Sequence, residues 1–137
     1  MKKLVSVLAA TLLAVCILLC ACSVKQITVL QESDNFVVLI FDSGFNGKTL
    51  SEAMENAKQN EQIDYTVEKG MVTTINGITN ADNKYWMLYT DDEDFANTAW
   101  GQITYQDKTY GSATKGISDL IVKDGKTYIW VYTEINY

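Results

Sequence analysis

The chain has 137 residues, a formal net charge of −6 and neither histidine nor arginine. Its length suits one domain once a targeting segment is removed. The acidic balance disfavours nucleic acid as a partner, because neutralising a phosphate backbone requires a surplus of Lys and Arg. Without histidine there is no imidazole base or imidazole metal ligand, and no recognised catalytic motif surrounds the serines and carboxylates. The composition therefore predicts a protein that is not an enzyme and has no cofactor.

The first 21 residues have the features of an export signal. Two lysines precede an almost wholly apolar run at 4–19, and Ala21 and Cys22 follow. A small residue directly before a cysteine, after an apolar run, resembles the bacterial lipobox. Residues 1–21 are therefore predicted to be a lipoprotein signal peptide, with Cys22 as the lipidated residue.

Two alternatives for this segment remain open. About 18 apolar residues can span a bilayer as a retained helix, and the chain could also be secreted without a lipid. All three interpretations place the folded part outside the cytoplasm, and lipidation would anchor it to the bacterial cell membrane through a tether at 22–26. The three cysteines, Cys16, Cys20 and Cys22, all precede the predicted domain at 27–137, so no disulfide is expected in it.

The predicted domain begins with a β-hairpin and one helix. Residues 27–31 and 36–42 are rich in β-branched and aromatic residues and flank a polar turn, which is typical of a hairpin. Thr49 and Glu52 have the spacing of a capping box and predict a helix start. The helix is expected to pack on a sheet through one apolar stripe, which consists of Leu50, Ala53, Met54 and Ala57.

The rest of the chain is expected to form strands joined by turns. Further β-rich runs occur at 65–67, 71–75, 85–90, 100–105, 108–111, 119–122 and 127–132. A hairpin, then a helix, then more strands is the element order of a β-grasp. The sequence therefore predicts an α+β, β-grasp-like fold in which one helix packs on a mixed, mainly antiparallel sheet.

One loop of this region, Asp91 to Asp94, consists entirely of carboxylate residues. Hard oxygen ligands of this kind suit Ca²⁺, but the loop lacks the alternating spacing and the turn glycine of an EF-hand. We therefore expect a solvated loop and predict no metal site.

The stretch from Gly70 to Thr90 offers the clearest candidate for a binding site. Asn76 and Gly77 are typical of a tight hairpin turn, although the next strong strand begins only near Lys84, so a longer connection is expected. In the aromatic strand that follows, alternation sends Tyr85, Met87 and Tyr89 to one face and Trp86 and Leu88 to the other. This strand is either buried on both faces or presents an aromatic platform to a ligand.

Five segments of the chain, taken together in their order and spacing, resemble the DUF4430 family. These segments are 47–53, 70–78, 85–89, 120–125 and 128–132. The family includes domains of bacterial surface proteins and the carboxy-terminal, cobalamin-capping domain of transcobalamin and intrinsic factor. The resemblance implies a β-grasp-like fold, no enzymatic activity and a surface able to cover a flat ligand. In the transcobalamin-like proteins a helical barrel supplies most ligand contacts, and these 137 residues contain no such barrel.

The resemblance also implies where a ligand would bind. The positions that match are the turn and the aromatic strand, and Trp100 is added because it stands in an expected loop. The candidate ligand-binding residues are Asn76, Gly77, Ile78, Tyr85, Trp86, Tyr89 and Trp100. We therefore expect a surface-anchored binding module for a small molecule, with a corrinoid such as cobalamin as the named candidate. The alternative is a cell-surface adhesion domain that binds a protein partner.

Overall fold

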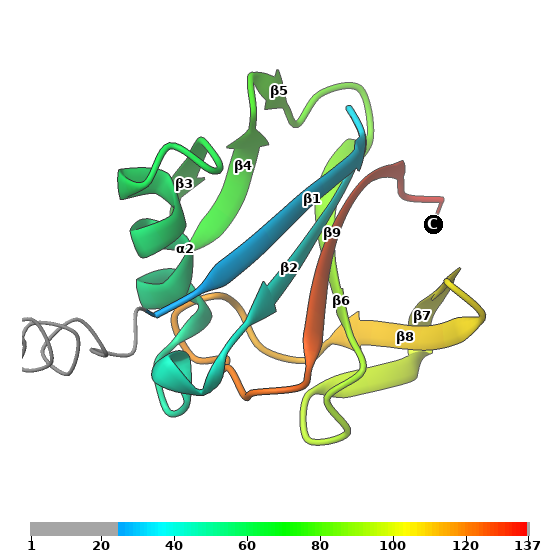
Figure 1. Ribbon diagram of the computed structural model, residues 1–137. Coiled ribbons are helices and arrows are strands. Elements are labelled where there is room, and N and C mark those ends of the chain that lie inside the picture. The colour runs from blue at the N-terminus through cyan, green and yellow to red at the C-terminus, as the bar shows by residue number, and fades with distance from the viewer. Residues whose placement is uncertain (1–24, 137) are drawn as a thin grey trace, which may run out of the picture.

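The structure is a computed structural model, and it describes residues 25–136 (Figure 1). The predicted signal peptide and the lipidation site at Cys22 lie outside the described residues. Among residues 25–136, no helix has the length and apolar character needed to cross a membrane. The first half of this part contains the strands β1 (Ile27–Ser33), β2 (Phe36–Phe41), β3 (Tyr65–Glu68) and β4 (Met71–Ile75), the short 3-10 helix η1 (Ser43–Phe45) and the helix α2 (Leu50–Gln59). The second half contains β5 (Ile78–Thr79), β6 (Lys84–Thr90), β7 (Ala96–Tyr105), β8 (Lys108–Ala113) and β9 (Thr127–Glu134).

The strands form two sheets. The larger has the order β1-β2-β9-β6-β8-β7 and the smaller has the order β3-β4-β5. Every strand pair in the described part of the chain is antiparallel. The predicted α+β, β-grasp-like fold with a mixed sheet is therefore wrong. The protein is instead mostly β, with one α-helix against two antiparallel sheets. The larger sheet is not mixed, because β3, β4 and β5 form a sheet of their own and β9 pairs antiparallel with both of its neighbours.

The helix predicted from the capping box is confirmed. The backbone N–H of Thr49 donates to Glu52 Oε2 at 2.8 Å, and the backbone N–H of Glu52 donates to Thr49 Oγ1 at 3.1 Å. These reciprocal bonds satisfy two of the backbone donors that a helix start leaves free. All four residues of the predicted apolar stripe are buried.

The main core lies between α2, the smaller sheet and one face of the larger sheet. Leu50 and Met54 of the helix belong to one apolar cluster with Leu39 of β2 and Tyr128 of β9, and none of the four is accessible to solvent. Ile75 of β4 joins the same cluster. Figure 1 shows α2, β3 and β4 together on one side of the larger sheet.

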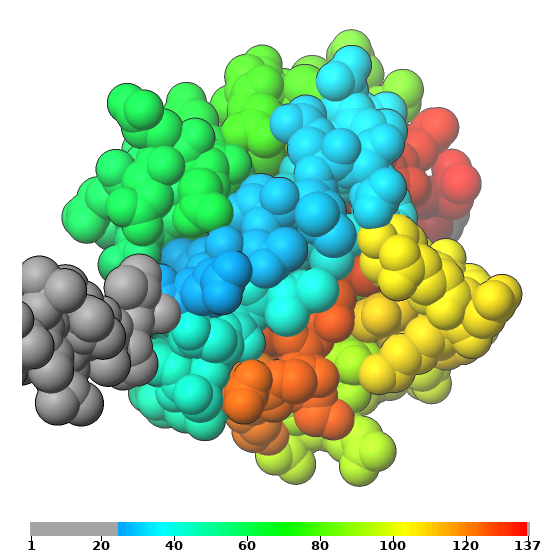
Figure 2. Space-filling model, viewed as in Figure 1, coloured from blue at the N-terminus to red at the C-terminus, as the bar shows by residue number. Residues whose placement is uncertain are grey.

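The hairpin of β7 and β8 covers the opposite face. Tyr110 of β8 packs there with Val38, Tyr89 and Ile129 in a second buried cluster. Figure 1 shows the hairpin running at an angle to the other strands, and Figure 2 shows it beside the end of β1. The hydroxyl of Tyr105 donates to Glu32 Oε1 and joins the hairpin to that strand.

The strand predicted at 119–122 is wrong. Ile121 makes an isolated bridge with Thr49 instead of joining a sheet. The carbonyl of Leu120 accepts from the backbone N–H of Leu50 at 2.8 Å. This segment is apolar because it packs beneath the start of α2, where Leu120 is fully buried.

Candidate functional site

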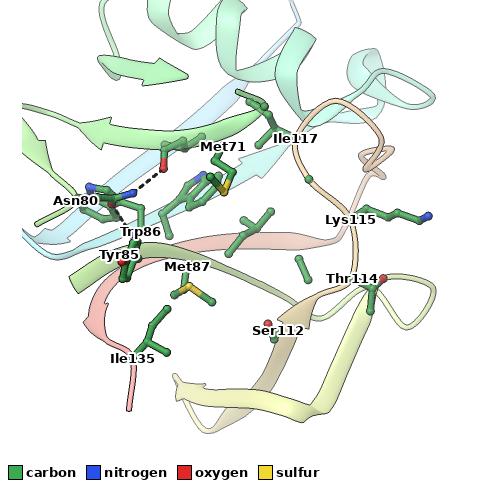
Figure 3. A pocket seen from close by; sticks show the side chains of 16 residues that line it. Met71, Asn80, Tyr85, Trp86, Met87, Ser112, Thr114, Lys115, Ile117 and Ile135 are labelled. Atoms are coloured by element: carbon green, nitrogen blue, oxygen red, sulfur yellow. Dashed lines mark hydrogen bonds between the residues drawn. The ribbon is translucent and has the colours of Figure 1, made fainter. Parts of the chain in front are cut away.

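A cavity of about 480 Å³ opens between β4, β6 and the loop that follows β8 (Figure 3). Ligand pockets in proteins commonly measure about 300–1,000 Å³ and are lined mainly by apolar side chains. The apolar walls of this cavity include Met71, Val72, Trp86, Leu88, Ile117 and Trp130. Its size falls within this range, and its lining is mainly apolar.

The cavity exists because two strands lack neighbours along part of their length. Strand β6 pairs with β9 from Lys84 to Thr90, but in the described chain it pairs with β8 only at Tyr89 and Thr90. Strand β4 likewise pairs with β5 only at Thr74 and Ile75. Residues 85–88 of β6 and 71–72 of β4, which lie in these unpaired stretches, line the cavity.

Asn80 closes one end of the cavity by bonding to both strands. Its backbone N–H donates to the carbonyl of Thr73 at 2.7 Å. Its side-chain amide donates to the carbonyl of Val72 at 3.3 Å and accepts from the backbone N–H of Trp86 at 2.9 Å (Figure 3). The amide thus stands in for a peptide group between two strands that are not paired there.

Trp86 forms a fixed wall of the cavity. Its Nε1 donates to the carbonyl of Ile78 at 2.8 Å. Its ring packs on Tyr132, with centroids 5.3 Å apart and an interplanar angle of 43°. Both contacts hold the indole in one orientation. The hydrogen bond is of the usual kind, since a buried tryptophan N–H generally finds an acceptor.

Trp130 differs from Trp86 in this respect. It lines the cavity and is 5 % exposed. Its Nε1 is buried and has no hydrogen-bond acceptor within residues 25–136. A buried, unpaired donor of this kind is uncommon in native proteins and destabilises the fold by about 1–3 kcal/mol. Trp130 was assigned no binding role from the sequence, because its place in an alternating strand indicates core packing.

Two methionines, Met71 of β4 and Met87 of β6, are among the lining residues (Figure 3). Met87 lies on the face of β6 opposite Trp86 and packs against the second buried cluster, so Met71 is the methionine on the β4 side of the space. Met71 is 66 % exposed, so its side chain is free to turn. Unbranched thioethers adapt to ligands of varied shape. No signal in the sequence identifies Met71, since a strand residue beside a turn has no features of a binding site.

The cavity has little charge. Among the described residues that line it, Lys115 alone carries a charged side chain, and Figure 3 shows that side chain pointing away from the space. Besides Lys115, the polar side-chain groups of the lining residues include the Asn80 amide and the Trp86 indole N–H, both already bonded, and the hydroxyls of Tyr85, Ser112 and Thr114.

The structure brings together part of the predicted site. Tyr85 and Trp86 line the cavity, and Ile78 is joined to it through its bond to Trp86. Asn76 and Gly77 instead form a tight turn between β4 and β5, with φ values of 47° and 84°. This two-residue hairpin corrects the longer connection expected after β4, since positive φ at both central residues is the primed turn that Asn-Gly favours.

Asn76 faces away from the cavity. Its backbone N–H donates to the carbonyl of Asp64 at 2.8 Å, and its Oδ1 accepts from the backbone N–H of Asp64 at 2.9 Å. Its Nδ2 donates to Gln31 Oε1 at 3.3 Å. These bonds tie the turn to β1 and to the segment after α2, which is a structural role.

The remaining two predicted residues lie elsewhere. Tyr89 belongs to the second buried cluster, on the face opposite Trp86, where burial raises the pKa of its hydroxyl. Trp100 was expected in a loop but stands in β7, at the irregularity between Asn97 and Gln102, and is 69 % exposed. Neither residue lines the cavity.

Three carboxylates of the acidic loop form ion pairs with lysines. Lys123 Nζ lies 2.9 Å from Asp92 Oδ1 and also bonds to Asp94, and Lys108 bonds to Asp91. The hydrogen bond from Lys123 lowers the pKa of Asp94 and raises the pKa of the lysine. Within residues 25–136 no group of carboxylates is placed to hold a metal ion.

Comparison of the chain with curated proteins and with solved structures gives no match. A family model described as a domain of unknown function, DUF4430, matches residues 47–109. The matched region runs from the residues before α2 to the first residues of β8 and includes β4, Asn80 and β6, which form most of the cavity. The resemblance inferred from the sequence is thereby confirmed, and residues 47–109 of the chain match the DUF4430 family.

Proposed function

We propose that this protein is a non-catalytic binding module that takes a small molecule into the cavity between β4 and β6. The observation that carries the proposal is a mainly apolar cavity of about 480 Å³, which residues of β4, β6 and the loop after β8 line. Cavities of this size with few polar groups are the usual form of a ligand site. The space is left open because no further strand pairs with β4 or β6 along these stretches in the described chain.

The side chains in the cavity support binding rather than catalysis. A serine and a lysine, Ser112 and Lys115, both line it. A nucleophile requires a base within hydrogen-bond reach, and the two side chains point in different directions in Figure 3. The Asn80 amide is engaged on both sides by the backbone.

A corrinoid is the candidate ligand, on the strength of the resemblance to the cobalamin-capping domain. A corrinoid is larger than the cavity, so one edge of the ring with its amide side chains would enter while the rest stayed outside. Met71 and Tyr85, both exposed, stand where they would contact the remaining surface.

Isothermal titration of the full chain, reconstituted in lipid nanodiscs, with cobalamin and with cobinamide tests this proposal. The blocking variant is Met71→Trp, which places a large rigid side chain in the cavity. The matched control is Val67→Trp, because Val67 is also an exposed apolar strand residue but does not line the cavity. We expect saturable heat for the wild type and for Val67→Trp and none for Met71→Trp. Equal heat from all three proteins would contradict binding in the cavity.

A lipid anchor at Cys22 is proposed as the means by which the domain is held outside the cytoplasm, on the strength of the lipobox-like sequence. Metabolic labelling with a palmitate analogue should mark the wild type and leave Cys22→Ala unmarked. Equal labelling of the two proteins would refute the anchor.

A protein-interaction or adhesion function is the second candidate, and exposed Trp100 favours it. This residue lies on β7, which is an edge strand of the larger sheet. Exposed tryptophans are frequent anchors of protein interfaces. A surface-protein partner of this kind should be lost from pull-downs with Trp100→Ala and retained with Met71→Trp. The reverse result would favour the cavity.

A further inference from the structure

The unpaired stretch of β6 offers two backbone groups to a ligand. We infer that the cavity between β4 and β6 recognises a short extended peptide unit, whose amide groups pair with the Leu88 N–H and the Trp86 carbonyl as an added strand would. The inference rests on the proposed function, since it names a ligand class for the same cavity.

The backbone groups of β6 alternate in direction, and the bonds around Trp86 show which ones point away from β9. Tyr132, the β9 partner of Trp86, donates its backbone N–H to the carbonyl of Asn35 at 2.9 Å, on the side of β2. The Trp86 N–H is therefore free of β9 and donates to Asn80 Oδ1 at 2.9 Å. Because hydrogen-bonded and non-hydrogen-bonded pairs alternate along an antiparallel ladder, the N–H and carbonyl of Leu88 point the same way.

Strand β8 ends its pairing before it reaches these groups. It pairs with β6 only at Tyr89 and Thr90, and its last residue, Ala113, pairs with β7. The Leu88 N–H and the Trp86 carbonyl lie beyond the last pair, so they have no strand partner within residues 25–136. Both residues line the cavity. An edge left open in this way is a template for an added strand.

Asn80 shows which chemistry fits between β4 and β6. Its carboxamide accepts from the Trp86 N–H and donates to the Val72 carbonyl (Figure 3). A carboxamide has the same donor and acceptor as a peptide group. The protein thus places one amide of its own between the two strands, at the position next to the unpaired groups. The amides of a peptide ligand would continue this pattern along β6.

The two unpaired groups specify the spacing of the ligand's amides. They flank Met87, so in an antiparallel ladder they face the groups on either side of one ligand residue. The carbonyl before that residue accepts from the Leu88 N–H, and the N–H after it donates to the Trp86 carbonyl. The smallest molecule with this spacing is an N-acyl amino acid N-alkylamide.

The position of Met87 also specifies the ligand's side chain. Residues directly opposite each other in an antiparallel pair project to the same face of the sheet. The ligand's side chain would therefore lie beside Met87, which packs against the second buried cluster. An apolar side chain suits this position.

Three blocked amino acids test the spacing and the side chain. N-acetyl-L-leucine N-methylamide carries both amides, N-acetyl-L-leucine methyl ester lacks the second N–H, and N-acetylglycine N-methylamide lacks the side chain. Each is titrated into the full chain in nanodiscs, labelled with ¹⁵N at its leucines and observed by NMR. The leucine amide should move the Leu88 N–H resonance downfield. The resonance of Leu30, which lies in the edge strand β1, should stay in place.

The affinities supply a second readout. The leucine amide should bind about two-fold to ten-fold more tightly than its ester, because the ester oxygen cannot donate to the Trp86 carbonyl. It should bind up to about five-fold more tightly than the glycine amide. Met87→Ala should reduce this preference for leucine. Val67→Ala should retain it, since Val67 is an exposed strand residue that does not line the cavity.

The outcomes separate this inference from the proposed function. Equal affinities of the leucine amide and its ester, or a Leu88 resonance that stays in place, would overturn the peptide pairing. Cobinamide is titrated in parallel under the same conditions. Saturable binding of cobinamide without binding of the blocked amino acids would overturn this inference alone, and absence of binding by all four probes would contradict both proposals.

Discussion

The indole N–H of Trp86 donates to the backbone carbonyl of Ile78 at 2.8 Å, and this bond joins the larger sheet to the smaller one. Ile78 lies in β5 directly after the Asn76-Gly77 turn. The turn and the aromatic strand are therefore linked, although the turn itself does not line the cavity. The hydrogen bond therefore holds the Trp86 indole in the cavity wall through Ile78, a residue that does not itself line the cavity.

Replacement of Trp86 should destabilise the protein more than replacement of Trp130. Trp86→Phe leaves the carbonyl of Ile78 without its donor, whereas Trp130→Phe removes a donor that has no acceptor. We expect the free energy of unfolding in urea to fall by about 1–3 kcal/mol more for Trp86→Phe than for Trp130→Phe. Equal losses would show that the Ile78 bond contributes nothing beyond packing.

Removal of the Asn80 side chain should loosen both strands at the cavity. Asn80→Ala leaves the Val72 carbonyl and the Trp86 N–H without these partners, and we expect a loss of about 1–3 kcal/mol in urea unfolding. Asn97→Ala is the control, because its side chain makes a local bond to Ala99. Faster amide exchange at Trp86 in the first variant alone would support the assignment, and unchanged exchange would oppose it.

The capping box should contribute measurably to the free energy of unfolding. Thr49→Ala removes the acceptor of the Glu52 N–H and should lower the free energy of unfolding by about 1 kcal/mol. Thr98→Ala, at an exposed position in β7, should change it by much less. Thermal unfolding tests this prediction, and Thr49→Ala should melt at a lower temperature than Thr98→Ala. Equal melting temperatures would contradict a stabilising cap.

Stability should fall at alkaline pH. Burial raises the pKa of Tyr65 and of Tyr128 to about 12, from an ordinary value of about 10. Because the folded state holds these protons longer, their contribution is complete below about pH 10 and is lost as the pH rises to about 12. The raised pKa of Lys108, caused by its hydrogen bond to Asp91, acts in the same direction.

Urea unfolding measured across this pH range checks the alkaline prediction. Tyr65→Phe removes one of the titrating groups and should make the decline shallower. The tyrosine hydroxyl donates to Glu55 at 3.3 Å, so a small pH-independent loss is also expected. A decline as steep in the variant as in the wild type would exclude Tyr65 as a contributor.

The sequence predicted the elements whose signals are local. The capping box at Thr49 and the apolar stripe of α2 lie within one helix, and the structure contains both. The pairing of strands is not local. Nothing in residues 65–79 specifies that they pair with one another rather than with the larger sheet, and the predicted mixed sheet fails for this reason.

The same limit applies to the candidate site. Alternation correctly separates Trp86 from Tyr89 onto opposite faces of β6. It does not reveal that the edge of that strand is open, because the opening depends on where the β7–β8 hairpin leaves the sheet. Trp130 and Asn80 acquire their positions from this tertiary arrangement, so neither could be selected from sequence spacing.

The central claim is that a small molecule binds in the cavity between β4 and β6, and the methyl group of Met71, which lines this cavity, reports on binding directly. The full chain, labelled with ¹³C at its methionine methyls, is titrated with cobalamin and observed by NMR. We predict a saturable shift of Met71 and no shift of Met54, an α2 residue that is buried in the main core. An unchanged Met71 resonance throughout the titration would contradict binding in the cavity.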